Sequence, residues 1–143
     1  YGAADAFLIA ETGGLNAMIV DSTALPEQAV RDIVASAYQS AGQRCSALRI
    51  LAVQEDIEGS LLAMLEGAAH ELRIGDPWDP ATDVGPVIDA EAKAVIEAHS
   101  ARMTEAGRLL FQVPLPEAIA GQGRCWRKPA KRFSPAFILV PRR

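Results

Sequence analysis

Short apolar segments alternate with longer segments whose apolar residues recur every three or four positions. The short segments are 6–10, 17–20 and 48–53, and runs of four to six apolar residues suit buried β-strands. The longer segments, 26–41 and 57–72, carry the broad apolar stripe of an amphipathic helix. Strands that alternate with helices in this way predict an α/β fold, in which helices cover a sheet.

The ends of the first two expected helices carry capping residues. Pro26 suits a first helical turn, and the polar residues 21–23 are candidate N-caps upstream of it. Gly42 is placed to end the first helix in a left-handed turn. Cys45 then follows on a loop, and Asp56 is expected to cap the second helix.

A third helix is expected from Asp89 to Gly107, followed by strands at 109–113 and 137–140. The residues between them, 114–135, show little pattern. The apolar positions of the third helix are Ala92, Val95, Ile96 and Met103. A length of 143 residues suits one ordinary domain with a single hydrophobic core.

The charge of the chain argues against nucleic-acid binding. The formal net charge is −4, whereas binding to phosphates needs a clustered basic surface. A basic cluster does lie beside Trp126, and a solvated tail is the favoured interpretation of it over nucleic-acid contact. Its residues are Arg124, Arg127, Lys128, Lys131 and Arg132. No apolar stretch is long enough to span a membrane.

The cysteines and histidines predict neither a disulfide framework nor a metal site. Cys45 and Cys125 could form one disulfide, but their spacing is unlike that of secreted disulfide-rich proteins. Neither His70 nor His99 has a partner at metal-ligand spacing. No signal peptide is recognised, so a reduced, cytoplasmic protein is expected. The start at Tyr1 rather than a methionine leads us to expect a processed chain or a fragment.

Cys45 and Glu11 are the candidate reactive residues. A nucleophilic cysteine must be accessible and partly ionised, and Arg44 places a positive charge beside Cys45. Glu11 follows an expected strand and precedes a glycine pair, and strand ends of α/β sheets are where ligand sites collect. Taken singly, each residue has a plainer interpretation. A lone cysteine is more often a small buried apolar residue, and a glutamate in a turn more often faces solvent.

Two motifs, one around each of these residues, favour a reactive role over the plainer interpretations. Residues 11–16 read Glu-Thr-Gly-Gly-Leu-Asn, and residues 42–46 read Gly-Gln-Arg-Cys-Ser, with 34 positions from the glutamate to the cysteine. They resemble the aldehyde dehydrogenase superfamily. The glycine–aspartate–proline segment 72–77 and the glycine–proline segment 83–89 resemble two further motifs of that family. The resemblance covers about residues 7–116.

Closer similarity points to one branch of the family. Segments 10–17, 40–49 and 112–116 resemble the glutamate-semialdehyde (Δ1-pyrroline-5-carboxylate) dehydrogenase domain of bifunctional proline utilisation A proteins. The resemblance implies part of an aldehyde dehydrogenase catalytic domain, with a mostly parallel sheet and flanking helices. It also implies oxidation of an aldehyde, here L-glutamate 5-semialdehyde in proline catabolism, with NAD or alternatively NADP as the cofactor. A homo-oligomer is implied for the full-length parent.

The same resemblance implies roles for individual residues. Cys45 would be the nucleophile that forms a thiohemiacetal and then a thioester, and its backbone N–H would help to stabilise the oxyanion. Glu11 would be the general base. Ser46 would help to bind the substrate carboxylate, although a polar turn residue is its plainer interpretation. Thr12 and Gly13 would lie near the nicotinamide, although turn geometry alone would also account for them.

The chain also departs from the family pattern. We expect residues 1–11 to be a remnant of the cofactor-domain edge, 12–116 a partial catalytic domain, and 117–143 a divergent basic segment. The main cofactor-binding segment is not found in this sequence. The isolated chain is therefore expected to lack dehydrogenase activity. Two alternatives remain open: a cysteine-dependent esterase, and a non-enzymatic truncated pseudoenzyme with an exposed apolar interface.

Overall fold

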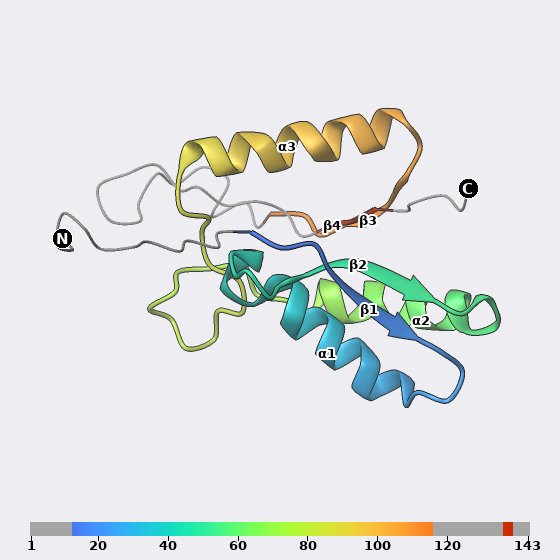
Figure 1. The fold of residues 1–143 in the computed structure, drawn as a ribbon. Helices are drawn as coiled ribbons and strands as arrows, with labels where there is room; N and C mark the ends of the chain where they lie inside the picture. Colours follow the sequence, from blue (N-terminus) through green and yellow to red (C-terminus); the bar gives the residue numbers. More distant parts are fainter. Residues whose placement is uncertain (1–12, 116–135, 139–143) are drawn as a thin grey trace, which may run out of the picture.

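The computed structural model describes residues 13–115 and 136–138, which form a mixed α/β structure (Figure 1). Along the chain lie β1 (Asn16–Val20), α1 (Pro26–Tyr38), the 3₁₀ helix η1 (Gln39–Gly42), β2 (Leu48–Val53), α2 (Glu55–His70), α3 (Ala90–Glu105), β3 (Leu109–Gln112) and β4 (Ala136–Ile138). The expected strand at 6–10 and most of segment 117–143 lie outside the described residues. None of the described helices is long and apolar enough to cross a membrane.

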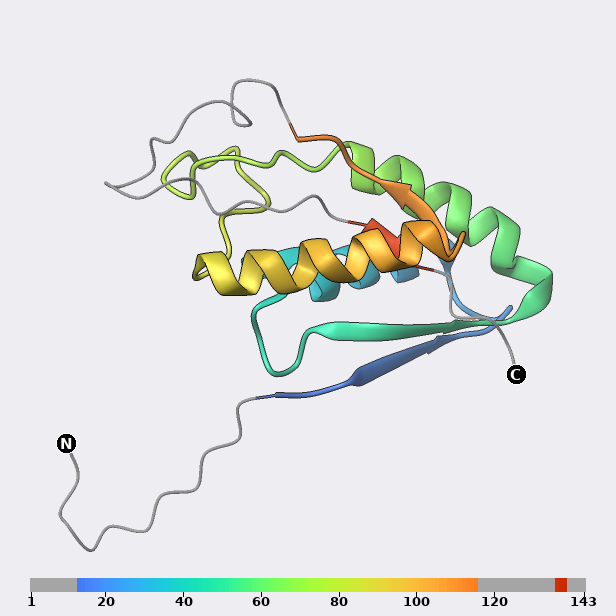
Figure 2. The same ribbon diagram turned by 90° about the horizontal axis from the view of Figure 1, so that it is seen from above.

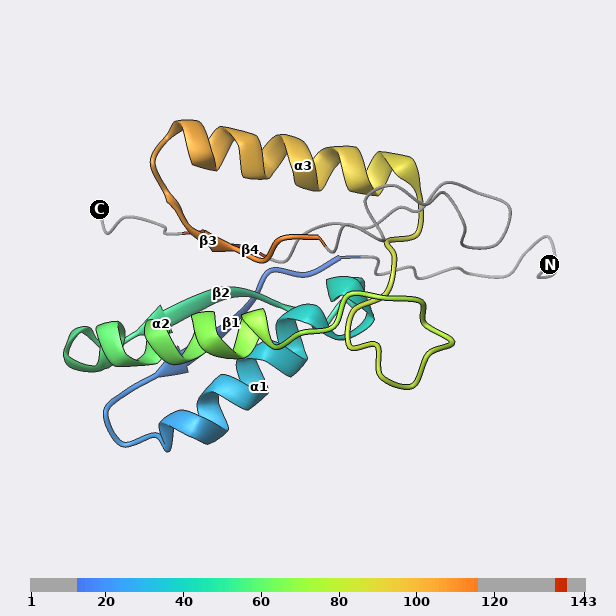
Figure 3. The same cartoon turned by 180° about the vertical axis from the view of Figure 1, so that it is seen from behind.

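β1 and β2 pair in parallel and are covered on one face by α1 and α2. Figure 2 shows the two strands running side by side, and Figure 3 shows the two helices next to each other. Burial alternates along β1, so that Met18 and Val20 face the helices. The helices contribute Ile33, Leu61 and Leu65, which are almost wholly buried. The predicted α/β arrangement of parallel strands and flanking helices is thus confirmed.

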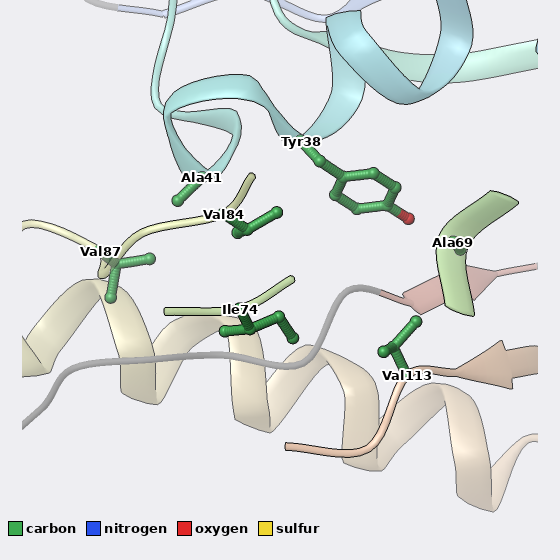
Figure 4. Packing of buried hydrophobic residues seen from close by; sticks show 7 residues of the cluster. All are labelled: Tyr38, Ala41, Ala69, Ile74, Val84, Val87 and Val113. Atoms are coloured by element: carbon green, nitrogen blue, oxygen red, sulfur yellow. The ribbon is translucent and has the colours of Figure 1, made fainter. Parts of the chain in front are cut away.

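A second buried cluster joins the end of α1 to the loop 71–89 and to the end of β3 (Figure 4). Its buried residues are Tyr38, Ala41, Ala69, Ile74, Val84, Val87 and Val113. Val34 and Ala37 of α1 pack against both clusters, so the single expected core is divided into two connected parts. α3 lies along β3 and β4, which pair antiparallel (Figure 1).

The face of the β1–β2 pair opposite the helices is apolar and open. The strand register pairs Ala17 with Ile50 and Ile19 with Ala52, so these four residues share that face. The exposed fraction is 82% for Ile19 and 46% for Ile50. Large apolar side chains left bare on one sheet face are typical of a surface that packs against further polypeptide.

The N-terminal cap of α1 differs from the expected one. The helix begins at Pro26 as predicted, but its N-cap is Leu25, which makes no side-chain capping bond. Asp21 instead accepts hydrogen bonds from the backbone N–H and the hydroxyl of Thr23, at 2.9 and 2.6 Å. The prediction of an N-cap from residues 21–23 was therefore wrong, because the Asp21 carboxylate accepts its hydrogen bonds from Thr23, in the turn before the helix.

Of the predicted N-caps of α2 and α3, the first is wrong and the second is confirmed. Gln54, rather than Asp56, is the N-cap of α2, and Asp56 lies in the first turn, where a negative charge favours the positive end of the helix dipole. Asp89 caps α3 as predicted, since its side chain accepts a hydrogen bond from the N–H of Ala92 at 2.7 Å. Val95 was expected on the packed, apolar face of α3, but it is 64% exposed and does not belong to that face.

The chain leaves α1 through an unusual left-handed turn. The α-helix ends at Tyr38, earlier than predicted, and η1 follows it directly. Ser40, Ala41 and Gly42 all have positive φ, at 55°, 56° and 68°. The left-handed conformation predicted for Gly42 is thus confirmed, but it begins two residues earlier. Non-glycine residues adopt this conformation at a cost, so surrounding contacts must hold the turn in place.

Candidate active site

Cys45 lies on the short loop that joins η1 to β2, and its side chain is exposed. The N–H of Ala47 donates a hydrogen bond to the carbonyl of Arg44 at 3.0 Å, which closes a tight turn around Cys45 and Ser46. Ser46 is exposed in the same turn. The prediction that Cys45 sits on a loop beyond the first helix is therefore confirmed, and the plainer interpretation of a buried cysteine is wrong.

The beginning of β1 lies against this loop. The side-chain amide of Asn16 donates hydrogen bonds to the carbonyls of Cys45 and Ala47, at 2.7 and 3.0 Å. Gly14 lies so close to the Cys45 carbonyl oxygen that a Cβ atom at this position would overlap it. The fold thus brings Gly14 and Asn16, from the described part of the first motif, against the motif at 42–46.

A strand irregularity places a second side chain on the loop. Asn16 is opposite Leu48 whereas Ala17 is opposite Ile50, so Arg49 is an additional residue on β2. The Arg49 guanidinium donates a hydrogen bond to the carbonyl of Gly42 at 2.6 Å. The bulge therefore directs a cationic side chain back to the start of the loop that carries Cys45.

Gln43 connects the same loop to the segment 86–88. Its side-chain nitrogen donates hydrogen bonds to the carbonyls of Ser40 and Pro86, at 2.9 and 3.4 Å. Its side-chain oxygen accepts a hydrogen bond from the N–H of Ile88 at 2.6 Å. Figures 1 and 3 place this stretch of loop beside η1. A third expected motif, the glycine–proline segment 83–89, is thereby fixed to the Cys45 loop.

The sequence reasoning missed Asn16, Gln43 and Arg49 as site residues. Asn16 and Gln43 belong to the quoted motifs, which was the available signal, but neither residue type suggests nucleophilic or acid–base chemistry. Arg49 is the last residue of the quoted segment 40–49. All three act on backbone atoms that are distant in sequence or hidden by a bulge, so a linear pattern does not reveal their partners.

The turn also orients the backbone N–H of Cys45. That N–H and the Arg44 carbonyl belong to one planar trans peptide group and point in opposite directions. The Arg44 carbonyl points into the turn, toward the N–H of Ala47. The Cys45 N–H therefore points out of the turn, and within the described residues it donates no hydrogen bond. An outward N–H next to an exposed thiol is the arrangement that an oxyanion requires.

Among the described residues, Gly13 is the one expected to lie near the nicotinamide. Gly13 is exposed, and a Cβ atom there would meet nothing within 4 Å, so a flat ring could approach its backbone. The described strand-to-helix connections have no glycine-rich turn for a pyrophosphate. Glu11 and Thr12 lie outside the described residues, so their expected roles stay predictions.

The titratable groups with shifted pKa values lie apart from the Cys45 loop. Burial raises the pKa of Tyr38, and hydrogen bonds from Thr23 lower the pKa of the exposed Asp21. His70 faces Phe111, with 6.4 Å between ring centroids, and His99 contacts an arginine on its own helix. The described part of the chain contains no cluster of three or more residues that could hold a metal ion.

Residues 3–125 match the aldehyde dehydrogenase family. The chain belongs to this family. The bifunctional protein PutA of Salmonella typhimurium is 62% identical over 105 residues, which are 73% of this chain and 8% of that protein. The 1-pyrroline-5-carboxylate dehydrogenase of Geobacillus kaustophilus is 39% identical over 103 residues, which are 72% of this chain and 20% of that protein.

Solved structures agree with this assignment. A crystal structure of a Bradyrhizobium japonicum proline utilization A mutant has a TM-score of 0.72 at 62% identity, and covers 75% of this chain and 11% of that one. The family and the branch predicted from the motifs are therefore confirmed, as is the fold. The chain spans less than a tenth of the length of the PutA relative and about a fifth of the pyrroline-carboxylate dehydrogenase.

Proposed function

We propose that this chain carries the nucleophile and the general base of an enzyme that oxidises L-glutamate 5-semialdehyde to glutamate, with NAD or NADP as the acceptor. The main support is the arrangement at Cys45: an exposed thiol, an outward N–H and a loop held by the side chain of Asn16. The relatives named for proline utilisation and for 1-pyrroline-5-carboxylate dehydrogenase support the choice of substrate.

In the proposed mechanism the Cys45 thiolate attacks the aldehyde carbon. A carbon–sulfur bond forms, and the carbonyl electron pair moves to oxygen, where the Cys45 N–H donates a hydrogen bond. Loss of such a donor typically costs ~10²–10³ in rate. A bound nicotinamide would supply the hydride acceptor for this step, and loss of the hydride from the substrate carbon would leave Cys45 as a thioester. Glu11 then takes a proton from a water molecule whose oxygen attacks the thioester carbon, and the carbon–sulfur bond breaks to release the acid and the thiolate.

Ser46 is proposed to bind the substrate carboxylate. It is exposed in the same turn as Cys45, so its hydroxyl can donate a hydrogen bond to a negatively charged group of an aldehyde that has reacted with the thiol. A hydrogen bond to a charged group contributes about 1.5–3 kcal/mol. This residue would therefore favour an acidic aldehyde over a neutral one of similar length.

The nucleophile and the substrate class can be tested on the chain itself. An aldehyde that adds reversibly to Cys45 protects the thiol from iodoacetamide, so protection by glutamate semialdehyde is compared with protection by pentanal. We expect protection at lower concentrations of the acidic aldehyde, and loss of that preference in Ser46→Ala. Equal protection by the two aldehydes would contradict the proposed substrate class, and no protection would contradict the role of Cys45.

The dehydrogenase step is expected to need more polypeptide than this chain. Hydride transfer requires an acceptor held against the reacting carbon, and the described strand-to-helix connections have no glycine-rich turn to hold its pyrophosphate. We therefore expect no NADH when the pure chain is mixed with glutamate semialdehyde and NAD. Stoichiometric formation of NADH would show that the chain holds its cofactor unaided.

Hydrolysis of activated esters is a second candidate activity. It needs an accessible thiol and an oxyanion donor but no nicotinamide, and the exposed side chain and outward N–H of Cys45 favour it. The test is release of p-nitrophenolate from p-nitrophenyl acetate over many turnovers. Turnover should vanish in Cys45→Ala. A single burst of p-nitrophenolate without turnover would show that Cys45 is acylated but that the thioester is not hydrolysed, which would contradict the esterase activity.

A further inference from the structure

The Asn16 amide uses both of its hydrogens on the loop that carries Cys45. One hydrogen bond goes to the carbonyl of Cys45 and the other to the carbonyl of Ala47, at 2.7 and 3.0 Å. An asparagine amide has only two donor hydrogens, so its donor capacity is fully engaged. Both acceptors are backbone atoms of one turn, and the donor comes from β1, 29 positions earlier than Cys45.

These contacts fix the peptide groups around the thiol. The Arg44–Cys45 peptide is held by the hydrogen bond from Ala47, and the next peptide is held through the Cys45 carbonyl by Asn16. Because peptide groups are planar, fixing both groups fixes the backbone dihedral angles of Cys45. The direction of its N–H relative to its side chain then follows.

We propose that Asn16 is a positioning residue that keeps the Cys45 N–H aligned with the oxyanion formed at the Cys45 sulfur. The inference rests on the proposed role of Cys45 as the group that attacks a carbonyl carbon. Asn16 itself touches only backbone carbonyls, so it acts on the reaction through the loop. Gly14 supports the same alignment, because its lack of a side chain lets β1 approach the Cys45 carbonyl.

The amide group is chemically specific for this task. Asn16→Asp has almost the same shape, but its carboxylate would face two carbonyl oxygens with no hydrogen to donate, so the loop must move away. Asn16→Gln keeps both donors on a side chain that is one methylene longer. The acid variant should therefore disturb the loop strongly and the longer amide less.

Two reactions of the same thiol separate positioning from simple loss of structure. Alkylation by iodoacetamide displaces iodide at carbon and forms no oxyanion. Acylation by p-nitrophenyl acetate begins with attack of the thiolate on the ester carbonyl, whose electron pair moves to oxygen. That pair then returns as p-nitrophenolate leaves, and Cys45 carries the acetyl group. Only acylation depends on the aligned N–H.

The experiment measures both rate constants on the full chain, with Cys125→Ser as the common background. In Asn16→Asp we expect acylation to fall by at least about tenfold more than alkylation, since a 1 Å misplacement costs ~10²-fold. Asn16→Gln should fall between wild type and Asn16→Asp. The matched control is Gln54→Glu, which also converts an amide to an acid but at the far end of the β1–β2 pair, where Gln54 bonds Ser22 and Asp56.

Each outcome decides a different point. An equal fall of both rates in Asn16→Asp, or the same selective fall in Gln54→Glu, overturns the positioning role and leaves Cys45 as a nucleophile. If wild-type Cys45 is alkylated but never acylated, the proposed function and this inference fall together. A selective fall in both Asn16 variants, measured well below the unfolding temperature of each variant and with an unaffected control, supports the proposal.

Discussion

Gly14→Ala tests whether the close approach of β1 to the Cys45 loop matters for chemistry. The added methyl group would overlap the Cys45 carbonyl oxygen and lie 3.2 Å from the side-chain nitrogen of Asn16. The carbonyl belongs to the backbone and cannot rotate away as a flexible side chain would. To reach an ordinary contact distance, the loop or β1 must shift by roughly 1 Å.

The cost to stability can be worked out from these contacts. The shift breaks the 2.7 Å hydrogen bond from Asn16 to Cys45, a net loss of about 1 kcal/mol. Crowding of a packed region adds about 1–3 kcal/mol. Replacing glycine also restricts the unfolded chain, which returns about 0.4–1 kcal/mol. The variant should therefore be less stable by about 1–3.5 kcal/mol, which urea unfolding followed by circular dichroism measures.

The effect on reactivity should be larger than the effect on stability. A displacement of about 1 Å at Cys45 predicts a fall of ~10²-fold in acylation by p-nitrophenyl acetate, measured well below the unfolding transition. Gly59→Ala is the matched control, because a Cβ atom at Gly59, in α2, would meet nothing within 4 Å. If Gly14→Ala is acylated as fast as the control, the close approach has no part in positioning the thiol.

Four changes test other parts of the structure. Gly42→Ala puts a side chain at φ 68° and only 2.8 Å from the Ala37 carbonyl, so urea unfolding should show a loss of about 2–4 kcal/mol. Gly59→Ala should instead gain about 0.5–1 kcal/mol. Burial raises the pKa of Tyr38 above its ordinary value of 10, so the folded state keeps a proton that the unfolded chain releases. Stability should therefore fall above about pH 10, by up to ~1.4 kcal/mol per pH unit, and Tyr38→Phe should remove that slope. Ile19→Thr, on the open sheet face, should lower the self-association of the chain in sedimentation, with little change in the free energy of unfolding. Unchanged self-association would show that this face does not bind a second copy of the chain.

The elements of the first half of the chain could be predicted because their signals are local. The apolar run at 48–53 became β2 with the same bounds, and the run at 17–20 became β1 with one added residue. Helix periodicity located α1 and α2 to within three residues at each end. The N-caps were harder to predict, because the Asp21 carboxylate could accept hydrogen bonds either from the helix N-terminus or from Thr23. In the structure it accepts them from Thr23.

The second half of the described chain depends on contacts that a linear pattern does not contain. β3 and β4 are separated by more than twenty positions, and their antiparallel pairing depends on tertiary packing. The helical repeat of α3 includes Val95, yet only one side of α3 meets β3 and β4, and Val95 faces away. Periodicity indicates which residues could face a core, whereas the number of packed neighbours determines which of them do.

The site contains two kinds of motif residue: one that can react with a substrate, and others that bind only the backbone of the loop. Cys45 is recognisable from its chemistry, because a thiol on a loop can attack a carbonyl carbon. Asn16, Gln43 and Arg49 have no such chemistry, and they bind the backbone at each end and in the middle of the turn. A loop with three left-handed residues would not keep one shape unaided, so the reactive thiol depends on these polar side chains for its direction. Their contribution is geometric, and it appears only when β1, β2 and the segment 86–88 are assembled around the loop.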